Sequence, residues 1–194
     1  MSTNSLVAYL REDGSVVSSY VHYDGYATGV GKMLLEKYNS EELAKDLAEN
    51  LGYASSLSET ISSSHEGRAN TDVAEVYSDY HEFEEYIREN GHFEYVYFWD
   101  THKDEWLVAS WENTKRKVFT GEGTDYEFES HWNGFESLVT VYIREGNDTV
   151  TRFRKMVSEG NLPHDYLDHA NELEGSISKW NKIIITEAVE ALAA

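Results

Sequence analysis

Residues 93–99 constrain the fold of this chain more than any other stretch. Large nonpolar side chains alternate along it, with Phe93, Tyr95, Tyr97 and Trp99 on one side and Val96 and Phe98 on the other. Successive residues of a strand point to opposite faces of a sheet, so both faces of this strand carry large nonpolar groups. Such a strand must be covered on both faces. We therefore expect it to lie in a sheet with packing layers on both sides.

Two β-hairpins are expected to build that sheet. Residues 93–100 and 105–111 form one of them, and residues 5–11 and 15–23 form the other. The turn of the N-terminal hairpin contains Asp13-Gly14, a pair that readily adopts the positive φ of a tight turn. The sequence thus predicts an α+β fold, in which two hairpins contribute to an antiparallel sheet with helices packed on it.

The helices are expected at residues 28–50 and 81–90, where nonpolar residues recur every three or four positions. Ser40 is the expected N-cap of the second helix within residues 28–50, and its nonpolar stripe is Leu43, Leu47 and Leu51. In residues 81–90 the inner and outer sides are predicted as follows: Phe83, Tyr86 and Ile87 face inward, and Glu82, Glu85 and Glu89 face outward.

A helical part is expected after the sheet. The sequence Gly121-Glu-Gly123 marks the predicted boundary, which divides the chain into an α+β domain at residues 1–120 and a helical extension at residues 121–194. The helices predicted in the extension are residues 132–144, 147–158, 163–174 and 176–192. Pro163 suits a first helical turn, and the stripe of the last helix is Ile177, Trp180, Ile184, Ala188 and Leu192.

Composition excludes several classes of function. The chain has 36 acidic and 16 basic residues, a net charge of −20, and this charge repels nucleic acids and anionic membranes. It has no cysteine, which excludes disulfides, thiol nucleophiles and thiolate metal sites. Long nonpolar runs and a secretion signal are missing, so we expect no membrane contact and a cytoplasmic location.

Acidic residues concentrate between positions 72 and 105, where eleven acids stand against two bases. The acidic face predicted from this segment consists of Asp79, Glu82, Glu85, Glu89, Asp104 and Glu105. Such a face can be a solvated surface that keeps the protein soluble, or it can contact a protein whose own groove is basic. Carboxylates spaced along a helix can also imitate the charge of a nucleic acid.

Residues 20–38 carry the pattern Y-x-H-x-D-G-Y-x-x-G-V-G-x-x-L-L-x-x-Y. With the Asp-Gly hairpin before it and the aromatic strand followed by Trp106-Leu-Val108, this pattern resembles a family of small bacteriophage and prophage proteins. The resemblance covers about residues 5–120. It implies a phage origin and a bacterial host, and it implies no catalytic residue.

The glycine-rich turn at residues 24–32 is a second candidate site. It differs from a phosphate-binding loop, because five residues separate Gly25 from Gly31 and Met33 stands where a Ser or Thr would hold magnesium. Free backbone N–H groups at a helix start could still bind an anion. The ligand residues predicted there are His22, Asp24, Gly25, Gly29, Gly31 and Lys32. The alternative is that the glycines let the helix approach the hairpin closely.

Two sets of histidines and aspartates are candidates for acid-base or metal chemistry. His22 and Asp24 lie two positions apart at a strand end and could pair. His164 with Asp168, and Asp165 with His169, have i,i+4 spacing, which on a helix suits paired side chains or metal ligands. A metal-dependent hydrolase would need further ligands that the sequence does not offer. We predict no catalytic residue, no cofactor and no metal.

The function predicted from these features is that of a phage-encoded, non-enzymatic acidic protein. It would bind and inhibit a host protein with a basic surface, such as a nucleic-acid-handling or defence enzyme, without binding nucleic acid itself. A small-ligand or nucleotide binder that uses the glycine-rich turn is the main alternative, and a metal-dependent hydrolase is a weaker one. The sequence leaves the oligomeric state open.

Overall fold

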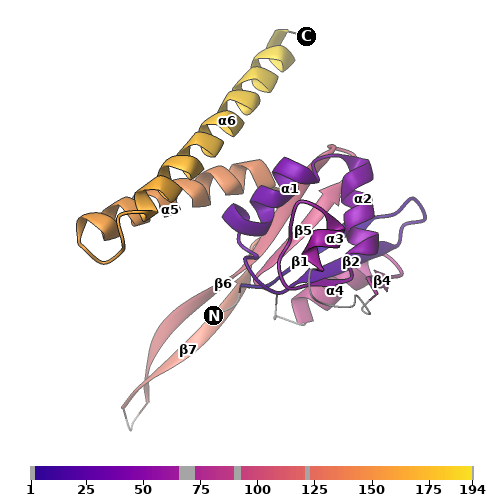
Figure 1. The fold of residues 1–194 in the computed structure, drawn as a ribbon. Coiled ribbons are helices and arrows are strands. Elements are labelled where there is room, and N and C mark those ends of the chain that lie inside the picture. Colours follow the sequence, from indigo (N-terminus) through magenta and orange to yellow (C-terminus); the bar gives the residue numbers. More distant parts are fainter. Residues whose placement is uncertain (1–2, 66–72, 90–92, 121–122, 194) are drawn as a thin grey trace. The chain divides into compact units, whose positions relative to one another are not determined.

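A computed structural model of the chain describes residues 3–65, 73–89, 93–120 and 123–193 (Figure 1). It has an α+β fold with a helical C-terminal part, as the sequence predicts. The chain forms two compact units, Met1–Leu138 and Val139–Ala194.

The sheet of the first unit is mixed. Its strands are β1 (Ser5–Leu10), β2 (Val16–Val21), β3 (Tyr53–Ala54), β4 (Glu75–Tyr77), β5 (Tyr95–Asp100), β6 (Glu105–Thr120), β7 (Gly123–Trp132) and β8 (Glu136–Ser137). The main path runs β3-β2-β1-β5-β6-β7, while β4 pairs with β2 and β8 with β6. Both predicted hairpins are present, but they join through β1 and β5, which are parallel. The sheet is therefore mixed, whereas the sequence predicted an antiparallel one.

Helices cover both faces of this sheet. The π-helical turn η1 (Ala27–Gly31), α1 (Lys32–Lys37) and α2 (Glu41–Asn50) belong to one face. There Ser19 Oγ of β2 donates to the carbonyl of Ala48, and Trp106 Nε1 of β6 donates to the carbonyl of Tyr38. Helix α4 (Tyr80–Glu89) packs on the other face, and the short α3 (Ile61–Ser64) follows β3 in the chain.

Strand β5 has the two-sided character expected of it. Tyr97 and Trp99 are buried on the side of α1 and α2, where the Tyr97 hydroxyl donates to the carbonyl of Gly25 at 2.7 Å. Val96 and Phe98 are buried on the side of α4. The side predicted for Phe93 was wrong. Phe93 packs with Val96 and Phe98, because the regular strand begins only at Tyr95.

Helix α2 begins and ends as predicted. Ser40 accepts a hydrogen bond from the backbone N–H of Leu43, and Gly52 follows the helix with a φ of 62°. The stripe differs from the prediction, because Leu47 and Leu51 are fully buried but Leu43 is 44% exposed. Two alanines, Ala44 and Ala48, complete the buried side instead.

Helix α4 has the sidedness expected of it. Phe83 and Ile87 are fully buried against Leu6 and Phe98, and Tyr86 is partly buried. Glu82, Glu85 and Glu89 are exposed.

The helical part begins at Leu138 and not at Gly121. Strand β6 continues to Thr120 and pairs with β7 from Thr120↔Gly123 to Trp111↔Trp132. The predicted boundary therefore falls between two paired strands of the first unit. The sequence of β7 does alternate polar and nonpolar residues, which is the period of a strand.

The second unit consists of two long helices. They are α5 (Leu138–Ser158), which starts one residue before the unit, and α6 (Tyr166–Ala193), in place of the four shorter helices predicted. The Tyr142 hydroxyl donates to Ser176 Oγ, and Arg154 pairs with Glu174 at 2.8 Å. Ile177 and Trp180 of the stripe predicted for α6 are buried, whereas Ile184 is 37% exposed and Ala188 is exposed as well. The side chain of Leu192, the last residue of that stripe, lies outside the described part of the chain.

Candidate functional site

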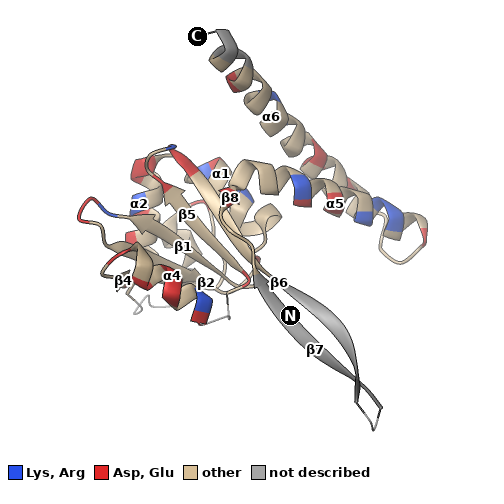
Figure 2. Ribbon diagram, turned by 180° about the vertical axis from the view of Figure 1, so that it is seen from behind, with Lys and Arg blue, Asp and Glu red and all other residues tan. Residues whose placement is uncertain are grey.

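Four of the predicted acidic residues are exposed on α4 or directly before it, and we call them the α4 outer face: Asp79, which precedes the helix, and Glu82, Glu85 and Glu89. Figure 2 shows acidic positions along α4. Asp79 Oδ1 accepts the backbone N–H of Glu82 at 2.8 Å, and Glu82 Oε2 accepts the backbone N–H of Ser78 at 2.6 Å. These two bonds form a cap at the start of the helix. The hydrogen bond with Ser78 lowers the pKa of Glu82, so this carboxylate stays ionised at neutral pH.

The remaining charges of α4 are arranged unevenly. Arg88 pairs with Glu84 at 2.8 Å, so the one arginine of the helix is bound on the flank. Glu85 lies 3.5 Å from His81, a contact that is ionic only when the histidine is protonated. Within the described part of the chain, neither Glu85 nor Glu89 pairs with a lysine or arginine. The carboxylates most available to a partner are therefore Glu85 and Glu89.

Asp104 and Glu105 do not belong to the α4 outer face. They lie at the turn between β5 and β6, which Figure 2 shows at the upper edge of the sheet, whereas α4 lies below it. Asp104 has a φ of 55°, a turn conformation, and Glu105 accepts a hydrogen bond from Ser137 Oγ at 2.8 Å. The six predicted residues thus form two separate groups, and the second group has local structural roles.

The glycine-rich turn uses its own backbone donors. The N–H of Gly25 donates to the carbonyl of Thr3 at 2.8 Å, and that of Val30 donates to the carbonyl of Asp24 at 2.8 Å. The N–H groups of Gly29 and Gly31 both donate to the carbonyl of Tyr26. An anion would have to displace these bonds, so the arrangement does not favour a phosphate site.

Close packing explains why the turn contains glycine. A Cβ atom at Gly25 would lie 2.7 Å from the backbone of Asn4, and one at Gly29 would lie 2.2 Å from the carbonyl oxygen of Asp24. A Cβ at Gly31 would lie 2.9 Å from Leu138 Cδ1. Any side chain at the first two positions would collide with backbone atoms. The alternative reading of these glycines, close approach of helix and hairpin, is the one that the geometry favours.

His22 and Asp24 have different partners. His22 Nδ1 lies 3.0 Å from the hydroxyl of Tyr20, and the Tyr26 hydroxyl donates to Asp24 Oδ1 at 3.1 Å. Asp24 also has a φ of 59°, so it serves as a turn residue. His22 and Asp24 therefore do not form the predicted pair. Lys32, the remaining residue predicted there, is the first residue of α1 and is partly buried.

The second histidine-aspartate set does not lie on one helix. His164 and Asp165 precede α6 in a tight turn, where the N–H of Leu167 donates to the carbonyl of His164 and that of Asp168 to the carbonyl of Asp165. The i,i+4 argument from the sequence therefore does not hold for these pairs. Among the described residues, no group of three or more His, Asp or Glu side chains is placed to hold a metal ion.

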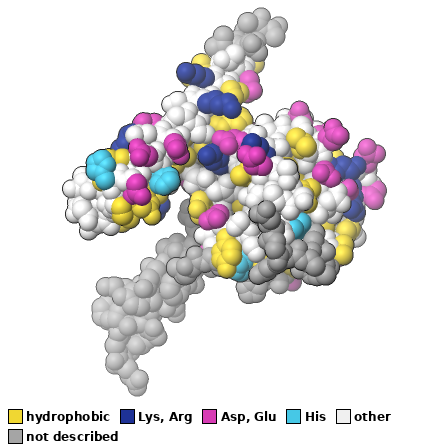
Figure 3. Space-filling model, viewed as in Figure 1, with side chains coloured by type: hydrophobic (Ala, Val, Ile, Leu, Met, Phe, Trp, Pro, Cys, Tyr) yellow, Lys and Arg dark blue, Asp and Glu magenta, His cyan; other side chains and the backbone are white. Residues whose placement is uncertain are grey.

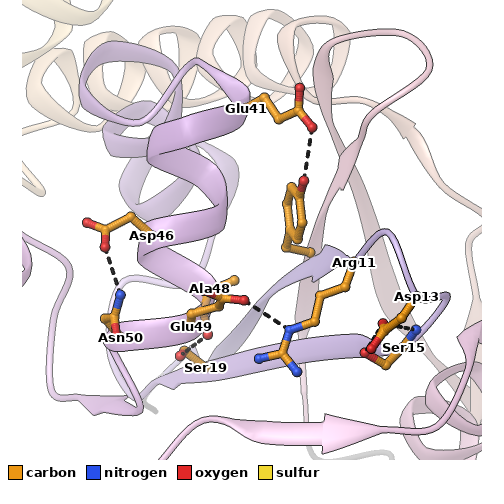
Figure 4. Close-up of polar contacts among 10 residues, drawn as sticks. Arg11, Asp13, Ser15, Ser19, Glu41, Asp46, Ala48, Glu49 and Asn50 are labelled. Carbon is orange, nitrogen blue, oxygen red and sulfur yellow. Dashed lines mark hydrogen bonds and ion pairs between the residues drawn. The ribbon is translucent and has the colours of Figure 1, made fainter.

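Around α2, by contrast, acidic side chains are mixed with bases or bonded within the fold. On the face drawn in Figure 3, acidic and basic groups lie next to each other around α2. Figure 4 shows Glu49 paired with Arg11 at 2.9 Å and Glu41 accepting the Tyr9 hydroxyl at 3.0 Å. Burial and the bond to Glu41 raise the pKa of Tyr9 to about 12. Helix α2 is acidic in sequence, but two of its four carboxylates, Glu41 and Glu49, are bonded to Tyr9 and Arg11 within the fold.

A cavity that the sequence did not indicate lies on the α4 side of the sheet, and we call it the aromatic cavity. Its volume is about 500 Å³, and its main lining residues are Ser18, Tyr20, Tyr53, Glu75, Tyr86 and Phe93. They come from strands β2, β3 and β4, from α4 and from the segment before β5. These segments are far apart in the sequence, and the pairing of β4 with β2 brings them together, so no local sequence pattern indicates the cavity.

Comparisons with family models, with curated protein sequences and with solved structures found no match. The likeness to bacteriophage proteins therefore rests on the sequence motifs alone. In the part of the chain that the structure describes, no helix combines the length and nonpolar character needed to cross a membrane.

Proposed function

We propose that this chain is a non-enzymatic binding protein that contacts a protein with a basic surface through the α4 outer face. The observation that carries the proposal is the exposure of Glu85 and Glu89 beside two carboxylates, Asp79 and Glu82, that the helix cap holds in place. A basic partner would supply the positive charges that this face lacks within the described residues.

The geometry of a helix suits such a contact. Each residue adds about 1.5 Å along the axis, so carboxylates three or four positions apart recur roughly every 4.5–6 Å. Fixed charges of one sign steer an oppositely charged partner and raise its association rate, and salt weakens the effect. The two capping carboxylates need no reorganisation on binding, because hydrogen bonds already orient them.

The finer proposal is that the protein is phage-encoded and inhibits a host enzyme in the bacterial cytoplasm. The motif at residues 20–38 supports the phage origin, and the net charge of −20 supports a target with a basic groove, such as a nucleic-acid-handling or defence enzyme. On this proposal the protein occupies the groove in place of nucleic acid, and it does not bind nucleic acid itself.

Neither alternative gains support from the geometry. A ligand site at the glycine-rich turn would need the backbone N–H groups of Gly25, Gly29 and Gly31, which already donate to the carbonyls of Thr3 and Tyr26. A hydrolase would need His164, Asp165, Asp168 and His169 on one helical face, and the first two precede the helix. We propose no catalytic role for these residues or for His22 and Asp24.

Capture from a bacterial lysate at low salt tests the proposal. The full chain serves as bait, and mass spectrometry identifies what it retains. Reversing the charge of the outer pair, Glu85→Lys with Glu89→Lys, leaves the helix cap intact and should abolish retention of the partner.

The matched control is Glu42→Lys with Asp46→Lys, also an exposed i,i+4 pair on a ten-residue helix. This control changes the net charge equally and should retain the partner. Retention by both double variants, or loss by both, would contradict the assignment to the α4 outer face.

A further inference from the structure

The aromatic cavity has walls made of connected rings. Tyr20 stacks on Tyr53 with ring centroids 5.4 Å apart, and Phe93 meets Tyr20 edge-on at 6.1 Å. Tyr86 of α4 lies 5.8 Å from Phe93 and continues the wall. The faces of aromatic rings carry partial negative charge and attract cations. A volume of about 500 Å³ lies within the range of small-molecule sites.

One carboxylate stands at the edge of this cavity. Glu75 pairs with Ser18 across strands β4 and β2, and its Oε2 accepts the Tyr77 hydroxyl at 2.7 Å. Burial raises the pKa of Tyr86, and the charge of Glu75 adds to that rise. The side chain of Glu75 is exposed, so its second oxygen can reach a ligand. No lysine or arginine occurs among the described lining residues.

A buried hydroxyl in the wall is the second polar feature. Ser18 is 2% exposed and lines the cavity, and its Oγ makes no hydrogen bond of good geometry with any described residue. It lies near the Tyr77 oxygen, whose proton is already donated to Glu75. Buried polar atoms without a partner are uncommon, because each carries a desolvation cost. A ligand that donates to Ser18 Oγ would remove that cost.

We infer that the aromatic cavity binds a small organic cation, an ammonium group attached to a nonpolar body. The ammonium lies against the ring faces and donates hydrogen bonds to Glu75 and Ser18 Oγ, while the nonpolar body fills the space between Leu6, Tyr53 and Phe93. An anionic ligand is disfavoured by Glu75. The inference does not depend on a protein partner at the α4 outer face, since its ligand residues are different.

Titration of the full chain with phenethylamine, followed by amide chemical shifts, tests the inference. The neutral analogue 2-phenylethanol has nearly the same shape and is the matched ligand control. We expect saturable shifts at Ser18, Tyr53 and Glu75 with the amine, and an affinity at least tenfold weaker with the alcohol. Equal affinities, shifts elsewhere, or no binding of the amine at millimolar concentration would overturn the inference.

A pair of variants tests the role of the carboxylate. Glu75→Gln keeps the shape and removes the charge, and it should weaken phenethylamine binding about tenfold or more. Asp24→Asn is the control, because Asp24 likewise accepts the hydroxyl of a tyrosine two positions away and lies outside the cavity. An equal loss in both variants, or none in Glu75→Gln, would show that the cation is not held at Glu75. If Glu75→Gln does not fold, the comparison of amine with alcohol on the unaltered chain decides the question.

Discussion

Helices α2 and α4 have the same length and similar numbers of charged residues, but their carboxylates have different partners. Each has ten residues, four acids and one base, and each packs on one face of the same sheet. In α2, Glu41 accepts the Tyr9 hydroxyl and Glu49 pairs with Arg11. In α4, Glu82 caps the start of the helix and Glu84 pairs with Arg88, while Glu85 and Glu89 remain open to solvent. An acidic helix is therefore a candidate contact surface only after the bonds of its carboxylates are known.

The largest expected effect is shared by the two helices and concerns their inner sides. Phe83 of α4 and Leu47 of α2 are both fully buried, so Phe83→Ala and Leu47→Ala should each lower the free energy of unfolding by about 3–4 kcal/mol. Urea denaturation measures this loss. Glu89→Ala and Glu42→Ala are the exposed controls and should change it by less than about 0.5 kcal/mol. A loss below about 1 kcal/mol at Phe83 would mean that α4 is not anchored as described.

A smaller effect should separate the two helices. The Ser19 hydroxyl donates to the carbonyl of Ala48 and accepts the N–H of Gly52, both at 2.8 Å in a buried place, so it bonds the end of α2 to the sheet. Ser19→Ala should lower the free energy of unfolding by about 2 kcal/mol. Ser15→Ala, in the same hairpin, removes only an exposed bond to Asp13 and should cost less than about 0.5 kcal/mol. Equal losses in the two variants would contradict this description.

Removing single charges on the outer sides of α2 and α4 should change the free energy of unfolding only near α2. Arg11→Met breaks the half-buried pair with Glu49 and should lower the free energy of unfolding by about 0.5–1 kcal/mol. Glu85→Gln and Glu89→Gln should leave it unchanged, because neither carboxylate has a lysine or arginine partner among the described residues. Thermal melting at constant pH compares the three variants. A clear loss in Glu89→Gln would show that this carboxylate stabilises the fold and is not simply exposed.

The least effect at neutral pH concerns Tyr9 beside α2. Burial and then the bond to Glu41 raise the pKa of Tyr9 to about 12, so the fold favours the neutral phenol. A raised pKa gives stability that is fully present below the unfolded value of about 10 and is lost as the pH rises to about 12. The difference in tyrosinate absorbance between the unaltered chain and Tyr9→Phe should show this late ionisation, and Glu41→Gln should lower the pKa of Tyr9. A difference signal for Tyr9 that appears near pH 10 would contradict the buried contact.

Local patterns predicted a good part of this fold. The alternation from Tyr95 to Trp99, the Asp-Gly turn and the Ser40 cap depend on neighbours in the chain, and the structure contains all three. The parallel pairing of β1 with β5 was missed, because it joins strands more than eighty residues apart. The side on which Phe93 packs was also predicted wrongly, because it depends on where the regular strand begins.

The candidate sites were harder to predict for a related reason. His22 bonds to Tyr20 and Asp24 to Tyr26, although sequence spacing favoured a bond between the two. The donors of the glycine-rich turn are occupied by the carbonyls of Thr3, Asp24 and Tyr26. The aromatic cavity depends on the pairing of β4 with β2. Each outcome depends on which of several polar or nonpolar partners the tertiary structure brings near.

The central claim is that the α4 outer face, and not α2, contacts a basic partner. Stopped-flow association of the captured partner over a series of salt concentrations tests it most directly. We predict that Glu85→Lys with Glu89→Lys slows association about tenfold at low salt, that added salt reduces the difference, and that Glu42→Lys with Asp46→Lys stays within about twofold of the unaltered chain. Equal slowing by the two pairs, or association that does not depend on either pair or on salt, would contradict the claim.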